Sequence, residues 1–205
     1  MRNFTSQPVD KELIVKLVEL ATHAPSACNI QGWHFIVVDD EKIKNWLVDE
    51  GGSVVIKNAP AGILILYDNR TKNTEYQDHI QSAAAAIENL LLGATYHNLG
   101  ACWICHLPPK NRVRQIFSIP KHMDPIAYLL LGHKEKISVD MPRKYQVEQM
   151  ISHNRYNGRV NEKNNQPILW IKKILMKIYY LAPLAIKKGF LNKYIDKKFV
   201  KKFKN

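Results

Sequence analysis

The densest group of hydrogen-bonding side chains in the sequence lies at residues 23–35, which read HAPSACNIQGWHF. Ser26 offers a hydroxyl group and Asn29 an amide, and both follow a stretch with helical periodicity. Polar groups held on a rigid turn beyond a helix end can bind a heterocyclic cofactor or a sugar-phosphate chain. The alternative is a turn whose side chains bond to one another and cap the preceding helix, while Trp33 fills the core. Spacing alone leaves both interpretations open.

Cys102 and Cys105 have the C-x-x-C spacing of dithiol redox sites. The stretch that contains them is typical of a strand, in which side chains three residues apart point to opposite faces. Buried small side chains in a core strand are therefore favoured over redox catalysis. With Cys28, the three cysteines are too few and too scattered for a secreted disulfide scaffold, so we expect a reducing cytoplasm.

Other motifs that carry chemistry are absent from the sequence. It contains no G-x-G-x-x-G after a strand, no phosphate loop ending in Gly-Lys-Ser/Thr, no H-E-x-x-H and no G-x-S-x-G. The eight histidines are dispersed without the spacing of metal ligands. We therefore expect no metal site.

Hydrophobic periodicity predicts the elements that must position these groups. The run AGILILY at 61–67 indicates a strand covered on both faces. The stretch 78–98 predicts a central helix closed by Gly100, and Gly132 is expected to end the last strand. The alternating order indicates a layered α+β or α/β domain. Helices are expected at 10–22, 41–48 and 78–98, a loop and helix at 107–117, and strands at 35–38, 61–67, 101–105 and 126–131.

Several segments, in the same order, resemble the nitroreductase family. The first is similar to the signature A/S-P-S-x-x-N-x-Q-P-W-x-F-x-V-V, and later ones to the family's central helix, closing strand and P-R-K phosphate-binding segment. Together they extend over residues 2–156. The matching segments are APSACNIQGWHFIVV (24–38), NAPAGILIL (58–66), residues 78–103, IAYLLLGH (126–133), MPRK (141–144) and ISHNRY (151–156).

The resemblance implies an α+β layered fold, with helices flanking a central sheet that contains antiparallel strands, around a long central helix. It also implies a homodimer with one FMN at each end of the interface, bound by both subunits. In family members NAD(P)H delivers hydride to the flavin and is replaced in the same pocket by a small organic acceptor, such as a nitroaromatic or a quinone. Since the protein positions and tunes the flavin, no catalytic side chain is expected.

The family's flavin-facing turn can be carried over residue by residue. Its positions correspond to Pro25, Ser26, Ala27 and Asn29, which the resemblance places against the flavin of the partner subunit. Gly32 stands where the family usually has proline, and we expect this change to loosen the turn.

Four further positions are implied to bind the cofactor. Arg143 matches the arginine that pairs with the FMN phosphate, a role suited to the bidentate guanidinium group. Arg2 matches the last basic residue of the family's N-terminal R-R-S-x-R/K-x-F motif. Cys105 and His106 occupy the loop whose backbone N–H faces flavin N5 in the family.

Two functions are consistent with this pattern. The first is an FMN-dependent oxidoreductase that passes hydride from NAD(P)H to a small organic acceptor. The second is a non-catalytic relative that keeps the fold while its tail docks to a membrane surface or a partner complex. The flavin-binding domain is expected over residues 1–156, followed by a linker and a basic helical tail over 157–205.

The net charge of +12 is concentrated in this tail. Residues 1–160 hold 18 Lys or Arg and 16 Asp or Glu, whereas residues 161–205 hold 12 Lys and 2 acidic residues. The segment 168–181 places apolar residues on one helical face and lysines elsewhere, a pattern that suits packing over a partner subunit or an anionic membrane surface. Residues 161–205 lack arginine and any base-reading motif, so nucleic-acid binding is not expected.

The expected location is the cytoplasm, with peripheral attachment at the inner face of the membrane as an alternative. The N-terminal segment lacks the apolar core of a signal peptide. No stretch of the sequence approaches the roughly 20 apolar residues of a membrane span.

Overall fold

The computed structural model describes residues 2–70, 72–135 and 142–156, together with residues 170, 171, 174 and 178. The chain divides into two compact units, the first formed by Met1–Lys136 with Pro183–Asn205 and the second by Ile137–Ala182. Each unit is considered by itself. Most of the predicted basic tail, including its lysines, lies outside the described residues. The predicted division into 1–156 and 157–205 stays a prediction.

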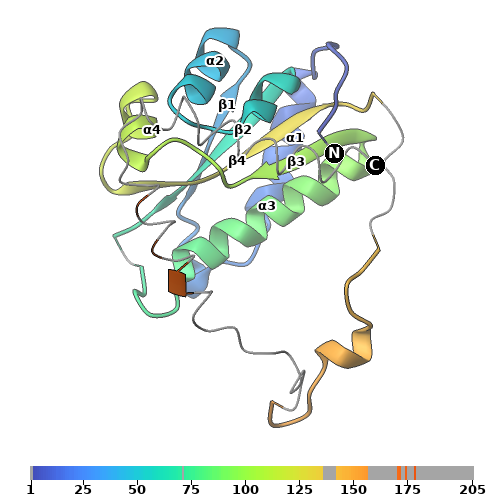
Figure 1. Cartoon of the computed structure of the whole chain (residues 1–205), viewed down its shortest axis with the longest axis vertical. Helices are drawn as coiled ribbons and strands as arrows, with labels where there is room; N and C mark the ends of the chain where they lie inside the picture. Colours follow the sequence, from blue (N-terminus) through green and yellow to red (C-terminus); the bar gives the residue numbers. More distant parts are fainter. Residues whose placement is uncertain are drawn as a thin grey trace. The chain divides into compact units, whose positions relative to one another are not determined.

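Helices and strands alternate along the first unit in the predicted order (Figure 1). Two of the helices begin directly after an aspartate that caps them. Asp10 accepts from the backbone N–H of Glu12, and Asp40 accepts from that of Lys42. The main elements are α1 (Lys11–Thr22), β1 (Trp33–Val38), α2 (Glu41–Asp49), β2 (Ala61–Asp68), α3 (Asp78–Tyr96), β3 (Leu99–Ile104), α4 (Lys110–Ile116) and β4 (Met123–His133). Three short 3-10 helices accompany them: η1 (Ala27–Asn29), η2 (Val54–Asn58) and η3 (Val147–Met150).

The two boundaries predicted from glycines are wrong. The long helix α3 ends at Tyr96, and the chain turns through Asn98, whose φ of +58° is left-handed, rather than at Gly100. Asparagine tolerates this conformation because its short side chain fits the left-handed region. Gly100 lies within β3, paired with Gly132, and β4 continues through Gly132 to His133.

The four strands form one antiparallel sheet in the order β1-β2-β4-β3. The two central strands, β2 and β4, are buried along nearly their whole length, which confirms the strand expected to be covered on both faces. The outer strands, β1 and β3, form the two edges. Together with the helices, this sheet confirms the α+β class.

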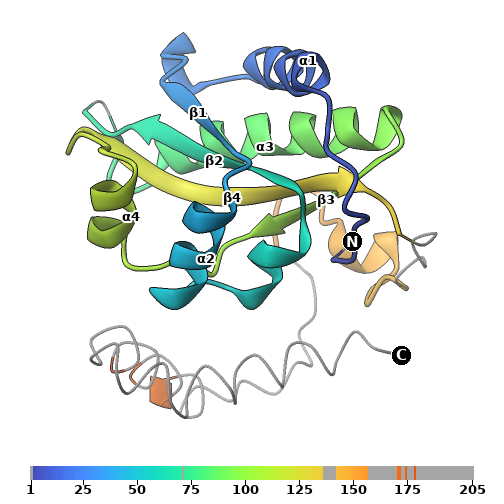
Figure 2. The ribbon, with the colours of Figure 1, turned by 90° about the horizontal axis from the view of Figure 1, so that it is seen from above.

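Helices cover both faces of the sheet (Figure 2). Helices α1 and α3 lie on one face and share a core with alternate residues of β2 and β4, such as Ile63 and Leu129. Helices α2 and α4 lie on the other face, where the second core includes Leu64 and Tyr128. The packing of α1 on α3 is close, because a Cβ added at Gly93 would lie 2.9 Å from the Leu17 side chain.

The second unit is described only in part. It contains η3, preceded by a Gln146 whose side chain and backbone form a capping box with Gln149. Residues 170, 171, 174 and 178 are helical. None of the helices in the described part of the chain combines the length and apolarity required to span a membrane.

Candidate functional site

The turn before β1 is built from left-handed residues and its own hydrogen bonds. Cys28, Asn29 and Gln31 have φ values of +51°, +57° and +52°. The Ser26 Oγ accepts from the backbone N–H of Gln31 at 3.0 Å, and the Asn29 Oδ1 accepts from Gln31 Nε2 at 2.7 Å. Left-handed conformations strain residues other than glycine by about 1 kcal/mol or more, so these contacts are needed to hold the turn.

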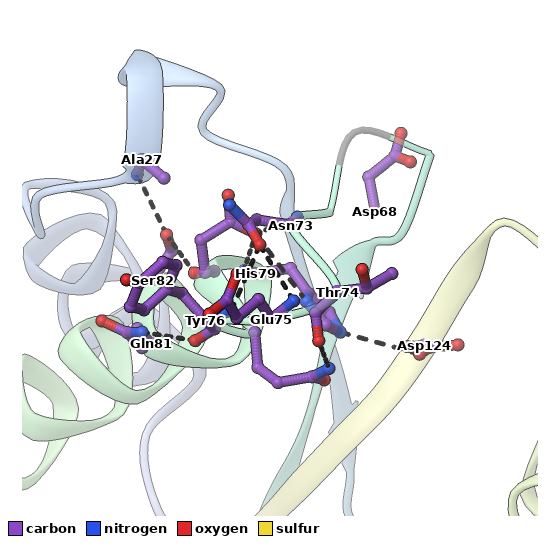
Figure 3. Close-up of polar contacts among 12 residues, drawn as sticks. Ala27, Asp68, Asn73, Thr74, Glu75, Tyr76, His79, Gln81, Ser82 and Asp124 are labelled. Carbon is purple, nitrogen blue, oxygen red and sulfur yellow. Dashed lines mark hydrogen bonds and ion pairs between the residues drawn. The ribbon is translucent and has the colours of Figure 1, made fainter.

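Helix α3 also holds the turn in place through a hydrogen bond. The backbone N–H of Ala27 donates to Ser82 Oγ at 3.1 Å, and the Ser82 hydroxyl donates to the backbone oxygen of Asp78 at 2.8 Å (Figure 3). Ser82 is 3% exposed, so this acceptor is part of the folded core. The turn is therefore tied to the first turns of the longest helix.

The predicted alternative, in which these side chains cap the preceding helix, is wrong. Helix α1 is closed by the backbone N–H of His23, which bonds to carbonyl oxygens of the last turn. Ser26 and Asn29 bond instead within their own turn. Asn29 is exposed and Ser26 half-buried, and in the described part of the chain no hydrogen bond uses the Asn29 amide nitrogen. The turn is self-bonded and still presents donors.

Trp33 and Gly32 join the turn to the sheet. The Trp33 ring packs edge to face on Tyr67, with ring centroids 6.2 Å apart, and is only partly buried. The Gly32 oxygen accepts from the backbone N–H of Asp68 at 2.8 Å. A Cβ at Gly32 would lie 2.9 Å from the Tyr67 ring. Gly32 is therefore a point of close packing, and the expectation that it loosens the turn relative to proline stays a prediction.

The loop after β3 contains Cys105 and His106. The His106 backbone oxygen accepts from the N–H of Ser53 at 3.0 Å, which ties the loop to the start of η2. Cys105 is exposed and lies beyond the end of β3, whereas Cys102 lies within β3 and is partly buried. Both are free thiols. The prediction that both are buried in a core strand is therefore wrong, because the strand ends one residue before Cys105.

The N-terminal segment that contains Arg2 lies beside the C-terminal end of β4. Phe4 forms an antiparallel bridge with Lys134, directly after β4. The backbone oxygen of Arg2 accepts from Asn58 Nδ2 at 3.2 Å. Arg143 belongs to the second unit and is exposed, and its position relative to Arg2 is not described.

Within the first unit, the structure does not bring the predicted cofactor residues together. The turn at 25–29 precedes β1 at one end of the sheet, since Trp33 pairs with Tyr67, which pairs in turn with Asp124 near the start of β4. The segment at Arg2 lies at the opposite end, beyond the end of β4. The loop at 105–106 follows β3, and β1 and β3 are opposite edges of the sheet.

Beside the turn lies a buried polar cluster that no sequence motif predicted. It contains His79, in the first turn of α3, and Asp124, whose carboxylate accepts from Asn69 Nδ2 at 2.9 Å and Lys110 Nζ at 3.2 Å. Arg114 also pairs with this carboxylate. His79 Nε2 lies 4.0 Å from Asp124 Oδ2 (Figure 3).

Burial sets the protonation of this cluster. Burial lowers the pKa of His79, against the attraction of the Asp124 carboxylate, because the imidazolium loses its hydration. Burial alone would raise the pKa of Asp124, but the hydrogen bonds from Asn69 and Lys110 outweigh it and hold that pKa below its ordinary value. A neutral histidine beside an ionised aspartate follows at neutral pH.

Among the described residues, no group of three or more His, Cys, Asp or Glu side chains could hold a metal ion. The turn presents the Ser26 hydroxyl and the Asn29 amide nitrogen as donors, which suit an organic ligand with oxygen and nitrogen acceptors.

Comparison with known families agrees with the turn, the central helix and the sheet just described. The model of the Nitroreductase family matches residues 1–50 and 47–133. The chain belongs to the nitroreductase family. Family membership makes it an oxidoreductase, and the predicted enzyme class is confirmed.

Individual relatives agree with this assignment. A protein of Methanothermobacter thermautotrophicus with the provisional name NADH dehydrogenase/NAD(P)H nitroreductase is 31% identical over 137 residues, which cover 65% of this chain and 71% of the relative. A solved nitroreductase family protein of Clostridium difficile 630 has a TM-score of 0.66 and 25% identity, covering 76% of this chain and 92% of its own. An FMN-dependent nitroreductase of Clostridium difficile R20291 has a TM-score of 0.64 and 24% identity, covering 76% and 94%.

Proposed function

We propose that this nitroreductase-family protein binds FMN and passes hydride from NAD(P)H to a small organic acceptor. The observation that carries the proposal is the turn at Ser26–Gln31, which is locked by its own bonds and by Ser82 yet leaves polar donors exposed. A turn that only connected α1 to β1 would not need three left-handed residues. The FMN-dependent relative of Clostridium difficile R20291 supports the choice of flavin.

The residues present fit FMN chemically. The Ser26 hydroxyl and the Asn29 amide nitrogen keep N–H and O–H donors, which suit the carbonyl and ring nitrogen acceptors of an isoalloxazine. Arg2 and Arg143 supply guanidinium groups that suit a phosphate dianion. When bound, FMN would supply the acceptance and donation of hydride. The protein's residues then hold the ring in place and neutralise the phosphate.

We expect the cofactor to bind between two copies of the chain. The turn and the Arg2 segment lie at opposite ends of one sheet, so one FMN can contact both only if they come from different copies. An exposed apolar face on α1 and α3 supports such a dimer, and it borders an open groove of about 880 Å³. The exposed apolar side chains of this face that line the groove are Leu20, Leu92 and Tyr96.

Subunit complementation tests the proposal. Arg2→Ala and Asn29→Ala each remove one predicted FMN contact. The Arg2 variant is expected to bind FMN roughly ten- to hundredfold more weakly, as for the loss of a charge-assisted contact, and the Asn29 variant about three- to tenfold more weakly, as for the loss of one hydrogen bond of about 1 kcal/mol. Refolding the two variants together produces mixed dimers in which one of the two sites has both Arg2 and Asn29. Titration of FMN, followed by flavin absorbance, should then show a class of sites with the original affinity.

A matched control is Asn45→Ala, which removes an exposed amide on α2, away from the turn. This variant should bind FMN as the original protein does. FMN-loaded protein should also lose its yellow colour when NAD(P)H is added. Protein that neither binds FMN nor oxidises NAD(P)H in its presence contradicts the proposal, and mixed dimers without recovered sites contradict the shared site.

A further inference from the structure

The second unit presents an apolar helical face. Trp170, Ile171, Ile174 and Ile178 are helical and are 66%, 51%, 37% and 57% exposed. At about 100° per residue, these four positions fall within an arc of about 100°. A stripe of one Trp and three Ile is costly to leave in water, since each such side chain gains from burial. We call these four residues the apolar stripe.

The sequence around the apolar stripe is strongly basic. Residues 161–205 hold 12 Lys against 2 acidic residues. In a helical projection of the sequence, Lys172 and Lys173 fall well outside the arc of the apolar stripe, and Lys177 falls just beyond its edge, next to Trp170. Apolar residues with tryptophan, flanked by lysines, are a pattern of helices that lie in the interface of a bilayer.

We propose that the apolar stripe docks on an anionic lipid surface, with the surrounding lysines attracted to the lipid headgroups. The charge of the segment favours this partner over a second copy of the chain, because two copies would bring a surplus of ten positive charges from each tail together. Tryptophan, like tyrosine, is enriched at headgroup level, and Trp170 is the most exposed member of the stripe. The docking places the oxidoreductase at a membrane surface.

Vesicle co-sedimentation of the full-length protein tests the docking. Vesicles of phosphatidylcholine with phosphatidylglycerol should bind the protein, whereas vesicles of phosphatidylcholine alone should bind it at least tenfold more weakly. Binding should weaken as salt is added, because salt screens the lysines. The protein has four Trp residues, so the blue shift of emission on binding should be compared with that of Trp170→Phe, in which it should shrink.

Two variants separate the apolar and the electrostatic contributions. Ile174→Ser should lower the partition coefficient about tenfold. Lys172→Gln combined with Lys173→Gln should lower it roughly thirtyfold, at about fivefold for each lysine. Val147→Ser is the matched control, since Val147 is an exposed apolar residue of the same unit and is 58% exposed. Its partition coefficient should not change.

Three results would overturn the docking proposal. The first is failure to bind either kind of vesicle, and the second is equal binding to both kinds. The third is a smaller fraction of dimer for Ile174→Ser in analytical sedimentation, with no change in vesicle binding. The last result would assign the apolar stripe to a second copy of the chain. The rate of NAD(P)H oxidation by FMN-loaded Ile174→Ser should stay unchanged, so the docking and the proposed activity succeed or fail separately.

Discussion

Two polar regions lie near the same end of the sheet and differ in what they do with their hydrogen bonds. In the cluster around Asp124, charged and amide side chains bond to one another. Asn69, Lys110 and Arg114 all contact the carboxylate of Asp124, a residue that is 7% exposed. In the turn at Ser26–Gln31, the bonds run mainly to backbone groups, and the Asn29 amide stays exposed. Helix α3 connects the two regions, with His79 facing the cluster and Ser82 holding the turn (Figure 3).

The difference separates polar residues that hold the fold from those available to a ligand. A buried carboxylate with three partners has little capacity left for a ligand, and removing it leaves cations unpaired. Exposed donors on a turn that other bonds hold can be removed with little loss of stability. We therefore expect changes in the cluster to affect unfolding first, and changes in the turn to affect cofactor binding first.

The largest effect is expected for Asp124→Asn. This change leaves Arg114 and Lys110 without their counter-charge, and removal of one partner from a buried ion pair costs about 3 kcal/mol or more. Denaturant unfolding of the FMN-free protein should show the loss. Asp49→Asn, an exposed aspartate at the end of α2, should change stability by less than about 0.5 kcal/mol. Equal stabilities of the two variants would argue against a structural role for the cluster.

Ser82→Ala should affect both regions. The backbone N–H of Ala27 loses its buried acceptor, which costs about 1–2 kcal/mol of stability. The turn is then less firmly held, so FMN affinity should fall as well. Unfolding and FMN titration of one preparation measure the two effects. Ser53→Ala serves as the control, because its side chain makes no cap hydrogen bond at η2. A loss of stability with unchanged FMN affinity would separate the turn from the cofactor.

Asn29→Gly, which removes the amide while glycine accepts the left-handed φ of +57°, should show the opposite profile. FMN affinity should fall about three- to tenfold, while the free energy of unfolding of the FMN-free protein changes by no more than about 0.5 kcal/mol. The Asn29 side chain bonds only to Gln31 Nε2 among the described residues, and both side chains are exposed. A variant that loses stability and retains full FMN affinity would show that Asn29 stabilises the fold, as the Asp124 cluster does, and does not bind the cofactor.

The smallest effect is expected from pH. Burial lowers the pKa of His79, so the unfolded chain takes up this proton before the folded protein does. The contribution of His79 to stability is therefore unchanged above about pH 6.5 and turns unfavourable as the pH falls below it. Unfolding curves from pH 7.5 down to about 5 should lose stability more steeply for the original protein than for His79→Gln. His34→Gln, at an exposed position, should follow the original protein.

Much of the fold followed from local patterns. Helical spacing predicted α1 and α2, and the structure shows an aspartate cap at the start of each, because capping and amphipathicity depend on residues within one or two turns. The apolar runs at 61–67 and 126–131 predicted strands, the first of them covered on both faces, and these two strands form the centre of the sheet. The assumption that a single glycine ends a helix or a strand failed, since Gly100 and Gly132 lie opposite each other inside strands.

By itself, the sequence determined the order of the elements, the polar composition of the turn and the lysine content of the tail. Tertiary structure decided which residues meet. The bond from Ala27 to Ser82 joins residues 55 positions apart, and that from Asn69 to Asp124 spans the same interval. Local periodicity carries no information on such pairs. Strand order likewise placed the turn and the Arg2 segment at opposite ends of one sheet, because register along β2 and β4 depends on contacts over the whole core.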